Sequence, residues 1–266
     1  MLTACLAQPL AGQATDSLAS ARRVVAAASL AAKEYALGVT PAGGQIVQPE
    51  EVDEAKLFIQ QAQFDVGTLP VAVRVMAGHT LTRLGAMLER LVPPDSVRVA
   101  VDLLVGRITE AAGGPKVIEQ VPARSPSLAR GVVVFRERCV ECHGESGRGD
   151  GPKAKQLEGP PPANLTDPKT MGGKPLLEIF RRIAIGVPGT AMPEFAEDIS
   201  VEDRWAVAAY VGAMQYGGSA TAATFAAVRR QVDSALAQRS DQIAFVAYLT
   251  FLQRETEVCA KKLGLG

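Results

Sequence analysis

The chain has 266 residues, of which 47% are hydrophobic and 5% aromatic, and its 28 basic and 28 acidic residues balance. A chain of this length predicts one or two domains. The balanced charge gives no field that would attract nucleic acid, and no run of about 18 apolar residues predicts a transmembrane helix in this chain. Abundant alanine and short β-branched runs favour an all-α fold.

Two short patterns near the N-terminus are typical of exported bacterial proteins. Residues 2–5 have the sequence Leu-Thr-Ala-Cys, which is similar to a lipobox, and Cys5 would then become a lipid anchor. Residues 10–14 instead resemble the small-residue end of an export signal. Neither pattern follows a basic segment or a full apolar segment. We therefore interpret residues 1–15 as a shortened signal or lipoprotein segment, with a flexible tail as the alternative.

Residues 16–115 contain four segments with apolar side chains at helical spacing. The first helix is expected to begin at Ser17 after an Asp16 cap and to end near Gly38, before a loop over residues 40–49. Three more helices are expected over residues 50–66, 73–91 and 97–111. Short breaks between amphipathic helices predict an antiparallel bundle.

The rest of the chain divides into three parts. Residues 116–126 contain two prolines and are predicted to be a linker, and residues 127–217 are predicted to form a second domain. Residues 218–266 carry two apolar stripes and predict a helical hairpin. A hairpin of this size is too small for a core of its own, so we expect it to pack on residues 16–115.

The sequence Cys139-Val140-Glu141-Cys142-His143 is a C-x-x-C-H motif. Its two thiols can form thioethers with the two vinyl groups of one haem, and the adjacent imidazole can bind the iron. The alternatives are a redox-active thiol pair and half of a zinc site. A zinc site needs further ligands, but the only other histidine is His79, which lies off the apolar stripe of its helix and is expected to be exposed. The remaining cysteines, Cys5 and Cys259, show no disulfide framework.

The surroundings of the motif agree with a haem site. A helix from Ser127 runs into the first cysteine and places Gly131 and Phe135 on one face. Four glycines between residues 144 and 151 predict a flexible loop that can wrap a haem edge, and the proline-rich residues 159–165 can form a wall on the histidine side. Two later helices are expected, one over residues 176–185 and one after a Ser200 cap.

The run from Gly186 to Pro193, Gly-Val-Pro-Gly-Thr-Ala-Met-Pro, joins the C-x-x-C-H motif in resembling class I c-type cytochromes. The resemblance covers about residues 127–216. It implies a class I cytochrome c fold with one covalent haem c, in which Met192 is the axial ligand opposite His143. Taken alone, Met192 could simply fill apolar space, as methionine often does. Met171 and Met214 lie nearby in the sequence but lack the loop pattern.

The same resemblance implies how the domain is assembled. The last helix would cross the helix before Cys139 near Gly131 and Phe135, with Tyr210 in or near the contact. Trp205 is expected in the core. Arg181 and Arg182 are candidates to pair with haem propionates, because arginine suits carboxylate recognition, and a plain surface position is the alternative.

The flanking helices resemble a second family. Residues 31–39, 51–62 and 248–257 are similar in order and pattern to the extracytoplasmic helical region of bacterial high-affinity iron permeases, some of which carry a cytochrome c domain there. The membrane-spanning part of that family is absent from this chain. The resemblance implies an iron permease and ferrous iron as partners. Carboxylates suit such a cation, and the candidate contacts are Glu50, Glu51, Glu54, Glu255 and Glu257, with a solvated helix face as the alternative.

The sequence therefore predicts a monohaem c-type cytochrome that transfers electrons in the periplasm or on the outer face of a bacterial membrane. Its redox partner is not predicted. A haem sensor or gas-binding module is one alternative, which requires a weak or absent sixth ligand. A cytochrome subunit of a separate dehydrogenase or oxidase is another. No nucleotide loop or hydrolase motif is present, so we do not expect this chain to be an enzyme by itself.

Overall fold

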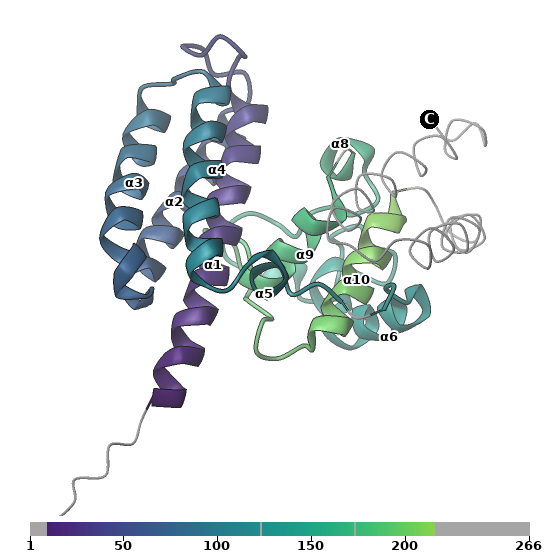
Figure 1. Cartoon of the computed structure of the whole chain (residues 1–266). Coiled ribbons are helices and arrows are strands. Elements are labelled where there is room, and N and C mark those ends of the chain that lie inside the picture. The colour runs from purple at the N-terminus through teal and green to yellow at the C-terminus, as the bar shows by residue number, and fades with distance from the viewer. Residues whose placement is uncertain (1–9, 123, 173, 216–266) are drawn as a thin grey trace, which may run out of the picture. The chain divides into compact units, whose positions relative to one another are not determined.

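The computed structural model describes residues 10–122, 124–172 and 174–215. These residues form helices joined by loops, with one isolated bridge between Val39 and Ile46, and the all-α prediction is confirmed for them. The chain divides between Val121 and Pro122 into two compact units (Figure 1). The predicted hairpin over residues 218–266 lies outside the described residues and stays a prediction.

Unit 1 is built from four long helices (Figure 1). They are α1 (Leu10–Gly38), α2 (Pro49–Asp65), α3 (Val71–Glu89) and α4 (Pro94–Ala111), with a short 3-10 turn, η1 (Val66–Thr68), between α2 and α3. Helices α1 and α3 each pack against both α2 and α4. The short connections make successive helices antiparallel, as the sequence predicts. Among the described residues, no helix is long and apolar enough to cross a membrane.

The core of unit 1 is formed by the apolar helix faces that the sequence predicts to point inward. On α2 the predicted inward residues Val52, Ala55, Ile59 and Ala62 are all buried. Small side chains on α1 let it approach its neighbours closely, since several of its alanines have no exposed surface. The hydroxyl of Tyr35 donates to the Val92 carbonyl at 2.6 Å and ties the end of α1 to the turn between α3 and α4.

Helix starts differ most from the prediction at α1 and α4. Helix α1 begins at Leu10 and not at Ser17, so Asp16 lies inside the helix and does not cap it. Helix α4 begins at Pro94 directly after Pro93. Proline suits the first turn of a helix because its fixed φ is already helical and the first N–H groups have no partner there. That preference places the start of α4 three positions before the predicted residue 97.

The predicted linker over residues 116–126 is partly structured. It contains most of α5 (Pro115–Glu119), where Ile118 is buried. The carbonyl of Val117 accepts a hydrogen bond from Arg22 Nε at 2.9 Å, which ties this segment to α1. The two prolines that suggested an irregular linker lie beyond α5, at its C-terminal side.

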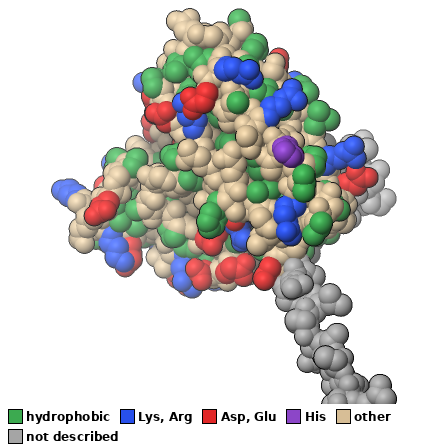
Figure 2. Space-filling view, turned by 90° about the vertical axis from the view of Figure 1, so that its left-hand side faces the viewer, with side chains coloured by type: hydrophobic (Ala, Val, Ile, Leu, Met, Phe, Trp, Pro, Cys, Tyr) green, Lys and Arg blue, Asp and Glu red, His purple; other side chains and the backbone are tan. Residues whose placement is uncertain are grey.

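The surface carries side chains of several chemical types. Figure 2 shows hydrophobic, acidic and basic side chains interspersed on the face that it presents. On unit 1 the exposed large hydrophobic residues include Phe64, Val71, Val75 and Leu103. The interspersed charges on this face agree with the balanced composition and give no support to nucleic-acid binding.

Unit 2 contains shorter helices separated by ordered loops. They are α6 (Leu128–Arg138), α7 (Val140–His143), α8 (Pro168–Met171), α9 (Leu176–Ile185) and α10 (Val201–Met214), with a 3-10 turn, η2 (Ala154–Gln156). The hydroxyl oxygens of Ser127 and Ser200 accept hydrogen bonds from backbone N–H groups in the first turns of α6 and α10. Ser200 is the helix cap that the sequence predicts, and Ser127, predicted as the first residue of its helix, is the cap of α6.

Helices α6 and α10 cross at a glycine. A Cβ atom on Gly131 would lie 2.2 Å from the Ala206 carbonyl oxygen, so only glycine permits this close backbone approach. One turn further along α6, the rings of Phe135 and Tyr210 meet edge to face with centroids 5.5 Å apart. The expected crossing near Gly131, Phe135 and Tyr210 is confirmed.

Replacing Gly131 with valine should destabilise unit 2 by about 2–3 kcal/mol, because the helices must separate to admit the side chain. Chemical denaturation of the purified full chain, followed by the optical signal of unit 2, measures this loss. Gly212→Ala on α10 is the matched control, since its new Cβ would meet only the ends of the Ile179 and Leu176 side chains, at 3.3 and 4.0 Å. Equal losses in the two variants would contradict the role of the crossing.

An ion pair connects α6 and α10 at the same crossing. The guanidinium of Arg130 donates two hydrogen bonds of 2.7 Å to the carboxylate of Asp203. These bonds from Arg130 lower the pKa of Asp203 below its ordinary value. A carboxyl whose pKa is lower in the folded state than in the unfolded state stabilises the fold at pH values above its ordinary pKa. That contribution is lost as the pH falls through the lowered pKa.

Asp203→Asn should therefore lower the melting temperature of unit 2 at about pH 7 and have a progressively smaller effect as the pH approaches about 3. Thermal unfolding at a series of pH values gives both numbers. The exposed Glu202, in the same helical turn, provides the control variant Glu202→Gln. A melting-temperature difference that stays constant down to the lowest pH would rule out the titration of Asp203 as its cause.

Candidate haem site

The C-x-x-C-H motif forms a single helical turn at the end of α6. The Cys139 N–H donates to the Phe135 carbonyl at 2.8 Å, and the His143 N–H donates to the Cys139 carbonyl at 2.9 Å. This turn is α7, and it holds both thiols and the imidazole within five residues. Both cysteines are half-buried free thiols. Two unbonded thiols on one turn are the arrangement that thioether attachment to a single haem requires.

Burial of Cys139 argues against a redox-active thiol pair. Burial, with a smaller effect of the neighbouring Cys142, raises the pKa of the Cys139 thiol to about 12. Reactive redox cysteines have a lowered pKa, because the thiolate is the nucleophile. The Cys139 thiol therefore lacks the character of a redox-active cysteine.

The glycine-rich loop after the motif is held against α7. The N–H groups of Gly149, Gly151 and Lys153 donate to the carbonyls of His143, Cys142 and Glu141 at 2.8, 3.1 and 2.8 Å. These three carbonyls have no partner within the short helix itself, so the loop satisfies them. A Cβ on Gly151 would lie 2.5 Å from the Glu141 carbonyl oxygen, which explains the glycine. The prediction of a flexible loop is corrected: backbone hydrogen bonds hold this segment in place.

The imidazole of His143 is oriented by the proline-rich segment. Its Nδ1 lies 3.2 Å from the carbonyl oxygen of Ala163. When Nδ1 carries the hydrogen it donates to this oxygen, and Nε2 is then the nitrogen that can bind a metal. Burial lowers the pKa of His143, which favours the neutral form that ligates iron. Residues 159–165 thus supply a contact on the histidine side, where the sequence predicts a wall.

Met192 lies in a closed loop between α9 and α10. Its N–H donates to the Thr190 hydroxyl at 3.1 Å, and its carbonyl accepts from the Val187 N–H at 3.2 Å. A positive φ at Gly186 starts this loop, and a Cβ there would lie 2.7 Å from the Met192 carbonyl oxygen. The loop pattern that the sequence marks is therefore a hydrogen-bonded unit that holds one methionine.

One apolar core contacts both the C-x-x-C-H turn and the loop that carries Met192. It is formed by buried residues of α6, α9 and α10, including Phe135, Phe180 and Trp205, and both Cys139 and Met192 pack against it. Trp205 has no exposed surface and stacks on Phe180 with centroids 4.2 Å apart, which confirms its predicted core position. The core brings together residues that are far apart in the sequence.

The other two methionines have different surroundings. Met171 is buried in the core at the end of α8, and the Met214 sulfur would lie 2.6 Å from a Cβ placed on Gly147. Neither lies in a loop like that of Met192. The Met192 assignment itself stays a prediction.

The arginines predicted to meet propionates lie on α9. Arg181 and Arg182 are both half-buried, and Arg182 Nε lies 3.7 Å from a carboxylate oxygen of Glu178. Arg182 therefore already contacts one carboxylate of its own helix. Pairing of either arginine with a propionate stays a prediction.

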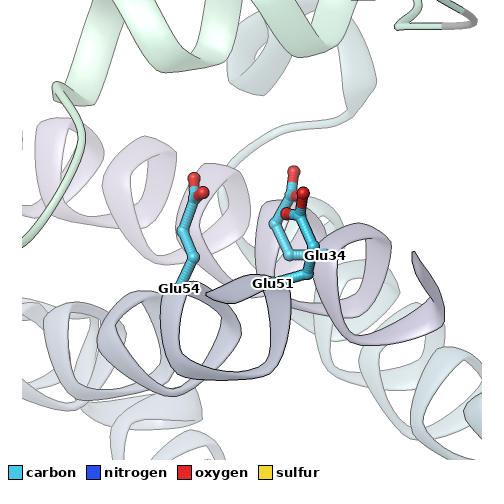
Figure 3. A group of neighbouring side chains, drawn as sticks. All are labelled: Glu34, Glu51 and Glu54. Carbon is cyan, nitrogen blue, oxygen red and sulfur yellow. The ribbon is translucent and has the colours of Figure 1, made fainter. Parts of the chain in front are cut away.

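Three carboxylates converge in unit 1, two of them predicted. Glu34 on α1 and Glu51 and Glu54 on α2 each place a carboxylate oxygen within 4.8 Å of the others. Figure 3 shows the side chains extending toward the same side, with those of Glu34 and Glu51 adjacent. Like charges this close repel one another unless a proton or a cation compensates them. Glu50, predicted with this group, is exposed and lies outside it.

Sequence reasoning did not select Glu34, although a signal was present. Glu34 lies three residues after Ala31 and directly before Tyr35, and all three are fully buried on one face of α1. A charged residue inside an apolar stripe is the pattern that could have identified it. His79 is exposed as predicted, and Glu255 and Glu257 lie outside the described residues.

Comparison with known families identifies unit 2. Residues 128–215 match the family model described as cytochrome c. These residues form a cytochrome c domain. A match of this kind implies covalent haem c, and the spacing of Cys139 and Cys142 is compatible with its attachment. No curated protein sequence matched the chain.

This chain is also similar to a protein of known structure. It is a chain of a reducing HAO-like protein complex from Kuenenia stuttgartiensis, with 30% identity and a TM-score of 0.35. The match covers 47% of this chain and 64% of that chain. This chain thus spans less than two thirds of the protein that it matches.

The residues of the cytochrome c domain fit a covalently bound haem. Two free thiols lie within five residues of a half-buried imidazole, and the Ala163 carbonyl lies within hydrogen-bonding distance of Nδ1 of that imidazole. The thioether of Met192 is carried by a loop that packs on the same core as Cys139. This donor set, of two thiols, one imidazole and one thioether, matches the chemistry of haem c attachment and of histidine–methionine ligation.

Proposed function

We propose that the cytochrome c domain binds one haem c through Cys139 and Cys142 and transfers electrons with His143 and Met192 as axial ligands. The observation that carries this proposal is the single helical turn in which both free thiols lie beside an imidazole already oriented through Nδ1. A haem bound there would supply a one-electron couple. The protein supplies tethering, ligand orientation and an apolar surround, which together set the reduction potential.

Purification of the full chain from a host that attaches haem c tests this function. We expect one haem for each chain, resistant to denaturing extraction, with a low-spin c-type spectrum when reduced. Reversible reduction and oxidation without binding of carbon monoxide would support electron transfer. A high-spin ferric spectrum with ready carbon monoxide binding would instead support the sensor or gas-binding alternative.

The proposed location is outside the cytoplasm, in the periplasm or on the outer face of a bacterial membrane. The resemblance to c-type cytochromes supports it, because their haem is attached on that side. Anchoring through Cys5 belongs to the same proposal, and Cys5 lies outside the described residues. Fractionation of cells that produce the full chain, followed by haem staining, tests the location, and haem-bearing protein in the cytoplasmic fraction would contradict it.

We also propose that ferrous iron is an electron donor to this domain. The support is the resemblance of the flanking helices to iron-permease segments, together with the convergence of Glu34, Glu51 and Glu54. Glu34 is fully buried, and a divalent cation would compensate the repulsion among these carboxylates.

Mixing the oxidised haem protein with ferrous iron under anaerobic conditions tests this donor. We expect haem reduction, and we expect it to be slower in the Glu34→Gln/Glu51→Gln double variant. Glu50→Gln is the matched control, since Glu50 is exposed on the first turn of α2. Equal rates in the two variants would contradict a role for the three carboxylates, and no reduction would exclude iron as a donor.

A further inference from the structure

Thr190 occupies a bridging position in the loop that carries Met192. Its hydroxyl donates to the Val187 carbonyl at 2.8 Å and accepts from the Met192 N–H at 3.1 Å. The Thr190 N–H also donates to the Val187 carbonyl, at 3.2 Å. A single side chain therefore connects the start of the loop to the backbone of the methionine.

The backbone of Met192 is held on both sides. Its N–H is bound by the Thr190 hydroxyl, and its carbonyl accepts from the Val187 N–H at 3.2 Å. Residues 187–192 thus form a ring of hydrogen bonds that closes on itself. Before the ring, Gly186 adopts a positive φ of 73°, and its missing side chain leaves room for the Met192 carbonyl.

A loop held by few apolar contacts opens more readily than a helix. Met192 and its neighbours Ala191 and Pro193 are only partly buried or exposed, so packing alone restrains them weakly. Each hydrogen bond of the ring adds to the free energy needed for opening, because opening exchanges it for bonds to water. The side chain with the largest share of these bonds is Thr190.

We propose that Thr190 is a positioning residue that keeps the Met192 thioether in place as an axial ligand. Thr190 acts through the Met192 backbone and does not itself bind the iron. Loss of its hydroxyl raises the fraction of molecules in which the loop is open and the methionine site can be taken by another ligand. This inference rests on the proposed function, since it requires that Met192 ligate a haem.

Imidazole is the probe for loop opening in the oxidised haem protein, because it takes the sixth position only when methionine has left. Thr190→Val keeps the shape of the side chain and removes the hydroxyl. Loss of one or two hydrogen bonds should raise the apparent imidazole affinity about 5- to 30-fold. Thr190→Ser restores the hydroxyl and should return the affinity to near that of the unaltered protein.

Thr166→Val is the matched control. The Thr166 hydroxyl donates to Asn164 Oδ1 at 2.8 Å in the segment before α8 and takes no part in the hydrogen bonds that close residues 187–192. This variant should leave imidazole affinity unchanged. Equal affinities in Thr190→Val and the unaltered protein would overturn the proposal, and so would failure of Thr190→Ser to restore the affinity.

Amide hydrogen exchange in the unaltered haem protein gives a second measurement that needs no variant. The Met192 N–H should exchange slowly, because the Thr190 hydroxyl accepts its hydrogen bond. Fast exchange at Met192 would overturn the proposal even if Thr190→Val failed to fold. If the unaltered protein lacks the sulfur-to-iron absorption band, Met192 is not an axial ligand, and the proposed function is contradicted. If the band is present but the Met192 amide exchanges fast, only the proposed role of Thr190 is overturned.

Discussion

Replacing both Cys139 and Cys142 with alanine should abolish covalent haem attachment in the full chain. Each thiol would supply one thioether to the proposed haem, and residues 139–143 contain no other sulfur. Haem staining after denaturing electrophoresis should show no band, and the yield of folded cytochrome c domain should fall sharply because a bound haem would contribute to folding stability. Either single variant should retain at most one thioether and a reduced yield.

The matched control for this prediction is Cys259→Ser. Cys259 lies far from the motif in sequence, and its removal should leave haem attachment unchanged. Covalent haem at normal stoichiometry in the double variant would contradict the attachment site. Loss of haem in the control alone would show that the C-x-x-C-H motif is not sufficient.

Replacing Met192 with alanine should convert the haem to a form without a sulfur ligand. The near-red sulfur-to-iron band of the oxidised protein should disappear, because no thioether remains in the Gly186–Pro193 loop. Histidine–methionine ligation raises the reduction potential, so the potential should fall by on the order of a tenth of a volt or more. Absorption spectroscopy and a redox titration measure the two effects.

Met171→Leu is the matched control for the axial ligand. Met171 is buried in the core of the same domain, and leucine conserves its volume. The control should keep the sulfur-to-iron band and a nearly unchanged potential. A band that persists in Met192→Ala and is lost in Met171→Leu would move the axial ligand to Met171.

The parts of the site that could be predicted from sequence are those whose chemistry is local. The C-x-x-C-H motif is recognisable because both thiols and the imidazole must lie on one turn, so their spacing is fixed in the chain itself. The Met192 loop was recognised through its resemblance to class I c-type cytochromes, and the contacts that close it are also local, since Gly186 and Thr190 act on residues fewer than seven positions away. The structure confirms both segments as ordered units, while the axial role of Met192 stays a prediction.

Several contacts between segments that are far apart in the sequence could not be predicted from it. The Ala163 carbonyl that orients His143 lies 20 residues away, and any backbone carbonyl can play this role, so its residue type carries no signal. The fixed glycine loop was taken for a flexible one because its hydrogen bonds go to carbonyls of α7 that become visible only in three dimensions. Glu34 lies within an apolar stripe of α1, and only the structure shows that its carboxylate lies beside those of Glu51 and Glu54.

The sequence by itself determined the all-α class, the inward faces of the long helices and the chemistry of the haem-binding turn. Helical periodicity and the spacing of a covalent attachment motif both depend on residues that are close together in the sequence, so short segments are enough to predict them. Only the tertiary structure decided that the turn at Cys139 and the loop at Met192 border one core, and that Glu34 lies buried beside Glu51. These outcomes depend on which helices pack together, and packing is a property of the whole fold.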